Sequence, residues 1–151
     1  MTILVAVETK VKINKEKRMK GCVPRDWEAV SNYEYSELGR IWICWNPKGW
    51  TCYVCSKSMQ QISLIATNKG GFQMLLTAIY GSTWQSKRVE LWKDMIQVKN
   101  QYGSFPWMVA GDFNVVRYTE ERVGGRKLTY NQLKEFNECL DACILTDIRS
   151  H

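Results

Sequence analysis

The stretch MVAGDFNVV, residues 108–116, places an aspartate and an asparagine two positions apart at the end of an apolar run. The run is typical of a buried strand, in which residues i and i+2 face the same side. Asp112 and Asn114 are therefore predicted to project together, with Phe113 facing packing and Gly111 leaving space beside the pair. A carboxylate there needs a partner, either a helix N-terminus, a basic residue, a metal or a substrate. A turn or a helix cap is the structural alternative for a single Asp-x-Asn.

Two further apolar runs end in polar residues. Glu8 follows TILVAV, residues 2–7, whose continuous β-branched character predicts a strand buried on both faces. Tyr80 ends LLTAIY, residues 75–80, and its phenol is able to hydrogen-bond a phosphate oxygen. If the strands are neighbours, these side chains converge with Asp112 at one rim. Carboxylates and water are the usual ligands of Mg²⁺, so such a rim suits a divalent ion and a phosphate.

Other segments supply the strands of the expected fold. Residues 40–46, RIWICWN, alternate large apolar residues and stop at a proline, which predicts a strand. Residues 60–81 contain two strand-like runs around NKGG, which predicts a hairpin. The segment between residues 10 and 39 shows no clear period and is expected to be irregular, residues 117–127 are expected to form a loop, and TDIRS, residues 146–150, is expected to begin a further strand.

Two segments have helical periodicity. The first, residues 85–103, is predicted to be an amphipathic helix whose apolar face contains Val89, Trp92, Ile96 and Lys99. The second, residues 128–145, is predicted to be a helix with Thr129 as its N-cap and with Leu133, Phe136, Leu140 and Cys143 or Ile144 on one face. Strands and single helices in this mixture predict one layered α/β or α+β domain over residues 1–151.

Composition and charge narrow the class of protein. The chain has 151 residues, of which 45% are hydrophobic and 24% charged, as in soluble globular domains. A net charge of +6 together with seven Trp, seven Tyr and four Phe favours a polyanionic partner, although an ordinary basic surface has the same composition. No run approaches the roughly 20 apolar residues of a membrane span, and no secretory leader is evident. We therefore expect an intracellular protein of the nucleus or cytoplasm, with no obligate protein partner evident.

The cysteines and tryptophans have more ordinary interpretations. A zinc site from Cys52, Cys55, Cys139 and Cys143 is conceivable, but the spacing is not that of a zinc ribbon, so reduced thiols are expected. The basic run KVKINKEKRMK, residues 10–20, is either a solvated face or a contact to a nucleic acid backbone. Four tryptophans are expected to be core residues, with stacking on bases as the alternative: Trp42, Trp45, Trp92 and Trp107.

The motifs VAVETK, LLTAIYG and WMVAGDFNVV, in this order and followed by RYTEERVGG and LTDIR, resemble the exonuclease-endonuclease-phosphatase superfamily. The amino-acid sequence of residues 111–125 and 134–150 is most similar to that of the endonuclease domain of plant LINE-type retrotransposons. The resemblance covers nearly the whole chain. It implies a four-layer α/β sandwich, in which two mixed sheets pack face to face with helices outside.

The resemblance also implies roles for individual residues. Glu8 matches the metal-binding glutamate, and Asp112 matches the aspartate that orients or deprotonates the attacking water. Asn114 matches the asparagine that holds the scissile phosphate, and Tyr80 matches the active-site tyrosine. The implied reaction is hydrolysis of a DNA phosphodiester assisted by Mg²⁺, with Mn²⁺ as a substitute.

The sequence departs from the family pattern at both ends. The family begins with a strand bearing an asparagine and ends with strands bearing an aspartate and an Asp-His pair, and this sequence contains none of them. The only histidine, His151, matches no family position. We therefore expect an incomplete, truncated domain with weak or no activity as the isolated chain. A non-catalytic nucleic-acid-binding remnant and a phosphatase of the same superfamily are the alternatives.

Overall fold

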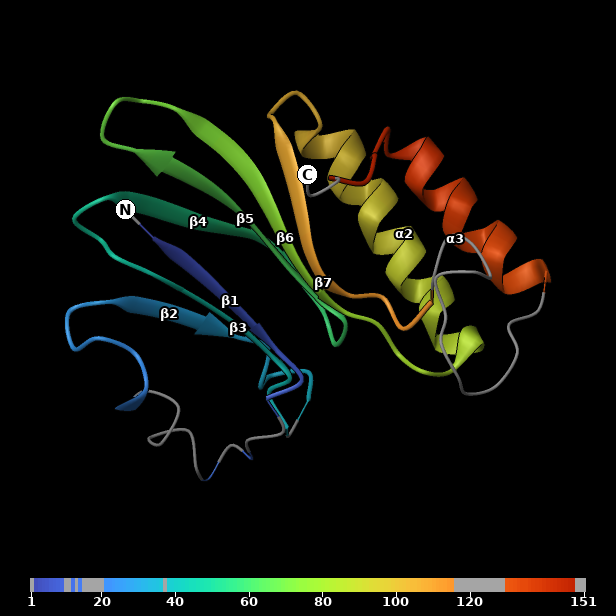
Figure 1. Ribbon diagram of the computed structural model, residues 1–151, viewed down its shortest axis with the longest axis horizontal. Coiled ribbons are helices and arrows are strands. Elements are labelled where there is room, and N and C mark those ends of the chain that lie inside the picture. The colour runs from blue at the N-terminus through green and yellow to red at the C-terminus, as the bar shows by residue number, and fades with distance from the viewer. Residues whose placement is uncertain are drawn as a thin grey trace. The chain divides into compact units, whose positions relative to one another are not determined.

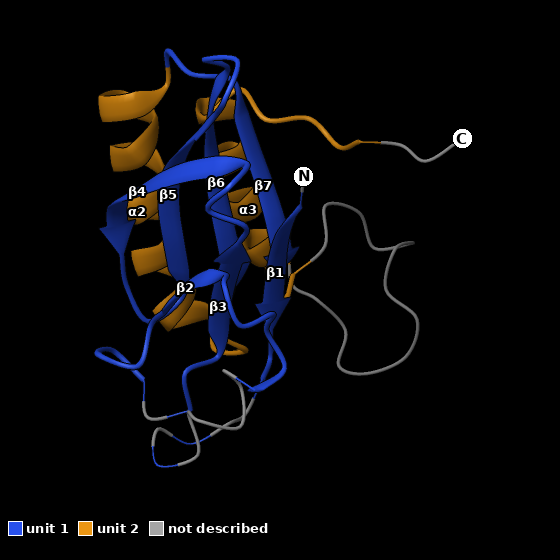
Figure 2. Cartoon of the chain, turned by 90° about the vertical axis from the view of Figure 1, so that its left-hand side faces the viewer, with its two compact units in different colours: residues 1–80, 104–112 blue, residues 81–103, 113–151 orange. Residues whose placement is uncertain are grey.

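The computed structural model describes residues 2–9, 12, 14, 21–36, 38–115 and 130–148. The chain divides into two compact units, the first formed by residues 1–80 and 104–112 and the second by residues 81–103 and 113–151 (Figure 2). Within these described ranges, two β-sheets and two helices give a mixed α/β architecture. Among the helices described, none has both the length and the apolar character that crossing a membrane requires.

The first sheet contains β1 (Ile3–Val7), β2 (Glu28–Ser31) and β3 (Ile41–Trp45) in the order β1-β3-β2, all antiparallel. The predicted strands at β1 and β3 are confirmed. The prediction that β1 is buried on both faces is wrong at Leu4, which is 48% exposed because β1 borders the sheet, whereas Ala6 on the same face packs against a buried cluster. The prediction of an irregular segment is also wrong at β2, whose four residues are too few to show a period.

The second sheet contains β4 (Trp50–Lys57), β5 (Gln61–Asn68), β6 (Gln73–Tyr80) and β7 (Trp107–Asp112) in that order. The predicted hairpin of β5 and β6 is confirmed. Its turn is closed by Asn68, whose side-chain oxygen accepts a hydrogen bond from the Phe72 amide, and by Gly71 at φ +87°. Strands β6 and β7 are parallel, so their C-terminal ends meet at one edge.

The core of the first unit lies between its two sheets (Figure 1). Strand β3 is buried along its whole length and supplies Ile41 and Ile43, and β5 supplies Ile62 and Leu64, each with no exposed surface. Burial of each such side chain contributes roughly 1.5–3 kcal/mol to folding. Of the four tryptophans predicted as core, Trp42, Trp45 and Trp92 are buried and Trp107 is half-buried.

The second unit contains the helices α2 (Gln85–Tyr102) and α3 (Tyr130–Ala142), which confirm both predicted helices. The face predicted for α2 is confirmed at Trp92, which is buried, and is wrong at Ile96, which is 39% exposed. The buried residues of α2 are Arg88, Leu91, Trp92, Met95 and Val98. Residues 91, 95 and 98 have the same helical spacing as residues 89, 92, 96 and 99, so periodicity alone fits either stripe.

The face predicted for α3 is confirmed at Phe136, Leu140 and Cys143, which are buried, whereas Ile144 is 77% exposed. Thr129, predicted as the N-cap, lies outside the described residues, as do the predicted loop at residues 117–127 and most of the basic run at residues 10–20. The strand predicted at residues 146–150 is wrong for residues 146–148, which are exposed and irregular, and residues 149–150 lie outside the described part.

The buried face of α2 leads to a direct test. We expect Leu91→Ala to lower the free energy of unfolding by about 2–5 kcal/mol, because it removes a fully buried side chain and leaves a cavity. Ile96→Ala is expected to cost less than about 1 kcal/mol, because that side chain is already partly in water. Urea unfolding of both variants measures the two free energies of unfolding. A larger decrease for Ile96→Ala than for Leu91→Ala would support the face predicted from the sequence.

An aromatic cluster organises the second unit. The ring of Phe113 lies 4.8 Å from that of Phe136 and 6.1 Å from that of Trp92, measured between centroids, and Trp92 stacks on Phe136 at 5.4 Å. Such contacts contribute about 0.5–1.5 kcal/mol each beyond burial. The prediction that Phe113 faces packing is therefore confirmed.

Candidate functional site

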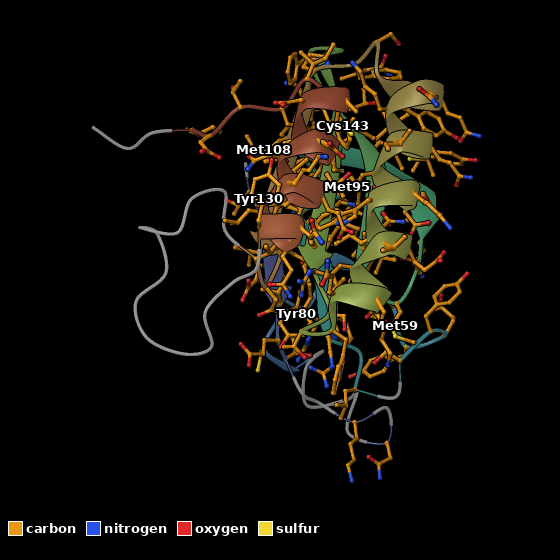
Figure 3. The ribbon with its side chains drawn as sticks, turned by 90° about the vertical axis from the view of Figure 1, so that its right-hand side faces the viewer. Met59, Tyr80, Met95, Met108, Tyr130 and Cys143 are labelled. Carbon is orange, nitrogen blue, oxygen red and sulfur yellow. The ribbon has the colours of Figure 1, made fainter. Side chains whose placement is uncertain are left out.

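Asp112 and Tyr80 end neighbouring strands. They are partners in the parallel register of β6 and β7, so their backbones lie about 4.8 Å apart, the usual spacing between strands. Asp112 is exposed and Tyr80 is half-buried. Figure 3 shows Tyr80 near the lower end of the strands, well separated from Met108 near the start of β7. The parallel pairing thus places a carboxylate and a phenol side by side at one sheet edge.

Gly111 has a different function from the one expected. Its φ is +133°, and a Cβ built there would overlap the carbonyl oxygen of Ile79 in the neighbouring strand. The expectation that Gly111 leaves space beside Asp112 is wrong, because β6 already fills that space. Glycine permits this backbone conformation and this close approach of the two strands. Both features lie immediately before Asp112 and so orient its backbone.

The sequence predicted that Asn114 shares a strand face with Asp112, and in the structure it does not. Strand β7 ends at Asp112, and Asn114 has φ +55°, a left-handed conformation that asparagine tolerates better than most residues. Its side-chain amide donates a hydrogen bond to the carbonyl of Gly81, and a Cβ at Gly81 would overlap the carbonyl of Phe113. Asn114 belongs to the second unit, where this bond joins the two segments that follow β6 and β7.

Glu8 is the first residue after β1 and also has a left-handed backbone, with φ +57°. The last pair of β1 and β3 joins Val7 to Ile41, so Glu8 leaves the first sheet where Arg40 enters it. The next residue, Thr9, donates its hydroxyl to the carbonyl of Gly39 at 2.7 Å, which holds the two chain segments together beyond the sheet. Glu8 itself is exposed.

Arg40 connects the two sheet ends. Its Nη1 donates to the phenol oxygen of Tyr80 at 3.3 Å, and its guanidinium carbon lies 5.3 Å from the centroid of the Tyr80 ring. The ends of β1, β6 and β7 lie at the same lower end of the first unit in Figure 1, and so does the start of β3. The structure therefore brings Glu8, Tyr80 and Asp112 to one rim of this unit, with Arg40 between the first sheet and the second.

Arg40 was missed by sequence reasoning. It stands alone before an apolar run, and such a residue is usually solvated. Its position opposite Glu8 depends on the antiparallel register of β1 and β3, which are more than thirty positions apart in the sequence. The local signal in the sequence was the glycine before it, Gly39, which has a φ of +46° in the structure.

The donor chemistry of the rim fits a hard divalent cation. Glu8 and Asp112 supply carboxylates, and Mg²⁺ is usually held by one or two carboxylates with water completing its coordination. Across the described residues, no three His, Cys, Asp or Glu side chains gather into a metal cluster. The four cysteines of the conceivable zinc site are split between the two units.

Three of the thiols in those pairs, Cys52, Cys55 and Cys139, have raised pKa values and are held away from the thiolate form that zinc requires. Burial and the charge of Glu28 raise the pKa of Cys52 to about 12. The hydrogen bond from Cys139 to Cys143, together with burial, raises the pKa of Cys139, while the same bond lowers that of Cys143. All six cysteines are free thiols.

Comparison with known proteins supports the fold. Neither protein-family models nor curated proteins gave a match to the sequence. Among solved structures, the chain is similar to the endonuclease domain of TRAS1, a telomere-specific non-LTR retrotransposon, with a TM-score of 0.66 and 9% sequence identity. The similarity covers 95% of this chain and 71% of the other. At this identity the likeness shows an endonuclease-type α/β fold and not a shared activity.

Proposed function

We propose that this chain is a LINE-type endonuclease domain of the exonuclease-endonuclease-phosphatase superfamily, with that superfamily's four-layer sandwich, and that it hydrolyses phosphodiester bonds in DNA with Mg²⁺. The observation that carries the proposal is the arrival of Glu8, Tyr80 and Asp112 at one rim of the first unit. The fold shared with a retrotransposon endonuclease domain and the net charge of +6 both favour a nucleic acid substrate. We place this activity in the nucleus or cytoplasm.

In the proposed reaction each rim residue has one task. Glu8 would hold the Mg²⁺ or Mn²⁺ ion, whose chemistry when bound is to neutralise charge on the phosphoryl oxygens. Asp112 orients a water molecule and accepts its proton as the water oxygen bonds to phosphorus and the bond to the leaving oxygen breaks. The phenol of Tyr80 donates to a phosphoryl oxygen, and the resemblance implies that the amide of Asn114 binds phosphate as well.

The direct test is nicking of supercoiled plasmid by the 151-residue chain, in Mg²⁺ and in EDTA. We expect slow nicking, so protein is used in excess over plasmid and the reaction is followed over hours. Asp112→Ala is expected to remove the Mg²⁺-dependent fraction. Nicking that persists at an equal rate in Asp112→Ala, or in EDTA, would contradict the proposal, whereas rapid nicking lost in Asp112→Ala would contradict only the expectation of weak activity.

A second candidate is a nucleic-acid-binding module without catalysis, favoured by the basic charge of the chain. It predicts DNA binding that is equal with and without Mg²⁺ and no nicking by the wild-type protein. A phosphatase of the same superfamily would instead release inorganic phosphate from a soluble phosphate ester. Both assays on one protein preparation separate the three activities.

A further inference from the structure

Arg40 carries a positive charge that no described carboxylate neutralises. It is half-buried, and it contacts Tyr80 through a hydrogen bond and through the face of the ring. Within the part of the chain that the structure describes, no ion pair includes it. Lys57 is a useful contrast, because its ammonium, with the side chain 19% exposed, pairs with Glu34 at 2.7 Å. At Arg40 the anion that would complement the charge is not supplied by these residues.

The geometry of the guanidinium suits a phosphate. Arginine has five N–H donors in a fixed plane, and one donor reaches Tyr80. The contact with the Tyr80 ring holds the orientation of the group, so that little side-chain freedom is lost when an anion binds. The remaining donors match the paired oxygens of a phosphate, which arginine binds in a two-pronged manner.

The position of Arg40 places such a phosphate at the proposed active site. Its strand begins where Glu8 leaves the same sheet, and Tyr80, its hydrogen-bond partner, is paired in the second sheet with Asp112. A phosphate on Arg40 would therefore lie at the rim that carries both carboxylates. The positive charge of the Arg40 guanidinium would offset part of the repulsion between this phosphate and those carboxylates.

We propose that Arg40 is a substrate-binding residue that holds a backbone phosphate of DNA beside the phenol of Tyr80. This inference rests on the proposed function for its substrate, but it concerns binding and requires no metal ion. Arg40 would give affinity for the phosphate without reading base sequence, since phosphate contacts fix position and register.

The test measures binding of a fluorescein-labelled DNA duplex of about 20 base pairs by anisotropy, in EDTA and at several salt concentrations. Arg40→Ala is expected to raise Kd about 10-fold or more, as for loss of a hydrogen-bonded charge. The slope of log Kd against log salt should fall by about 0.9, the value for one phosphate contact. Arg40→Lys keeps the charge and loses the planar fork, so we expect a rise of about 3-fold.

Arg25→Ala is the matched control. Arg25 is exposed and precedes β2, whose Glu28 pairs with Trp45 at the far end of β3 from Arg40. We expect its Kd to stay within about 2-fold of wild type. Circular dichroism checks that each variant is folded, and if Arg40→Ala is not, Arg40→Lys decides the question alone.

The outcomes separate this inference from the proposed function. The inference would be overturned if both Arg40 variants had the same Kd as the wild type, or if the wild type showed no measurable binding. A selective loss of binding at Arg40 in a protein that does not nick plasmid would leave the inference standing and contradict only the proposed hydrolysis. If nicking depends on Asp112 while Arg40→Ala changes neither nicking nor Kd, the proposed hydrolysis stands and the inference is overturned.

Discussion

Asp112→Asn is expected to lower the rate of Mg²⁺-dependent plasmid nicking about 10²- to 10⁴-fold at saturating Mg²⁺. Asparagine preserves the shape of the side chain but cannot accept the proton of the attacking water, and loss of general base catalysis has this magnitude. The side chain is exposed at the end of β7, so stability should change by less than about 0.5 kcal/mol. The rate is measured with protein in excess, so that product release does not limit it.

Glu8→Gln provides the contrasting variant in the same experiment. If Glu8 holds the ion, its loss should raise the Mg²⁺ concentration needed for half-maximal nicking, and higher Mg²⁺ should restore part of the rate. Asp112→Asn should show no such recovery. Equal responses of the two variants to added Mg²⁺ would contradict the separate tasks assigned to these carboxylates.

Local patterns predicted most of the elements that position the site. The β5–β6 hairpin, the strand at residues 107–112 and both helices follow from alternation, turn residues and helical spacing. The prediction failed where the deciding interaction was distant in sequence. β2 is defined by its pairing with β3. On α2, two overlapping stripes of residues fit the helical period equally well, and packing decides which stripe is buried.

The candidate site shows the same division. That Glu8, Tyr80 and Asp112 stand at strand ends was readable from the sequence, because each follows or ends an apolar run. Their meeting depends on strand pairing, and so does the position of Arg40. The left-handed backbone of Asn114 was not predicted, since an i, i+2 argument holds only while the strand continues.

Unfavourable backbone conformations gather around the ends of the two strands that carry the carboxylates. Glu8 and Asn114 are two of the three non-glycine residues with positive φ in the described chain, and Gly111 precedes Asp112 at φ +133°. Such conformations cost roughly 1–3 kcal/mol each and persist only where surrounding structure enforces them. At Gly111 an added Cβ would overlap the carbonyl oxygen of Ile79, and the effect of that overlap on stability is measurable.

Gly111→Ala is expected to lower the free energy of unfolding by about 3 kcal/mol, in the range of severe backbone substitutions. The added Cβ meets two obstacles: the positive φ of residue 111 and the carbonyl oxygen of Ile79, which as backbone cannot rotate away. Relief of the overlap requires β7 to move from β6 at the residue before Asp112. We therefore expect nicking by this variant to fall as well, even at temperatures where it remains folded.

Gly71→Ala separates the two obstacles. Gly71 also has a positive φ, +87°, but a Cβ there meets nothing within 4 Å. Its substitution should therefore cost only the conformational term, about 1 kcal/mol, and leave nicking unchanged. Urea unfolding of both variants gives the contribution of the strand contact as the difference between them. Equal losses at the two positions would mean that the approach of Ile79 to Gly111 imposes no constraint of its own, and that another feature sets the direction of the chain into Asp112.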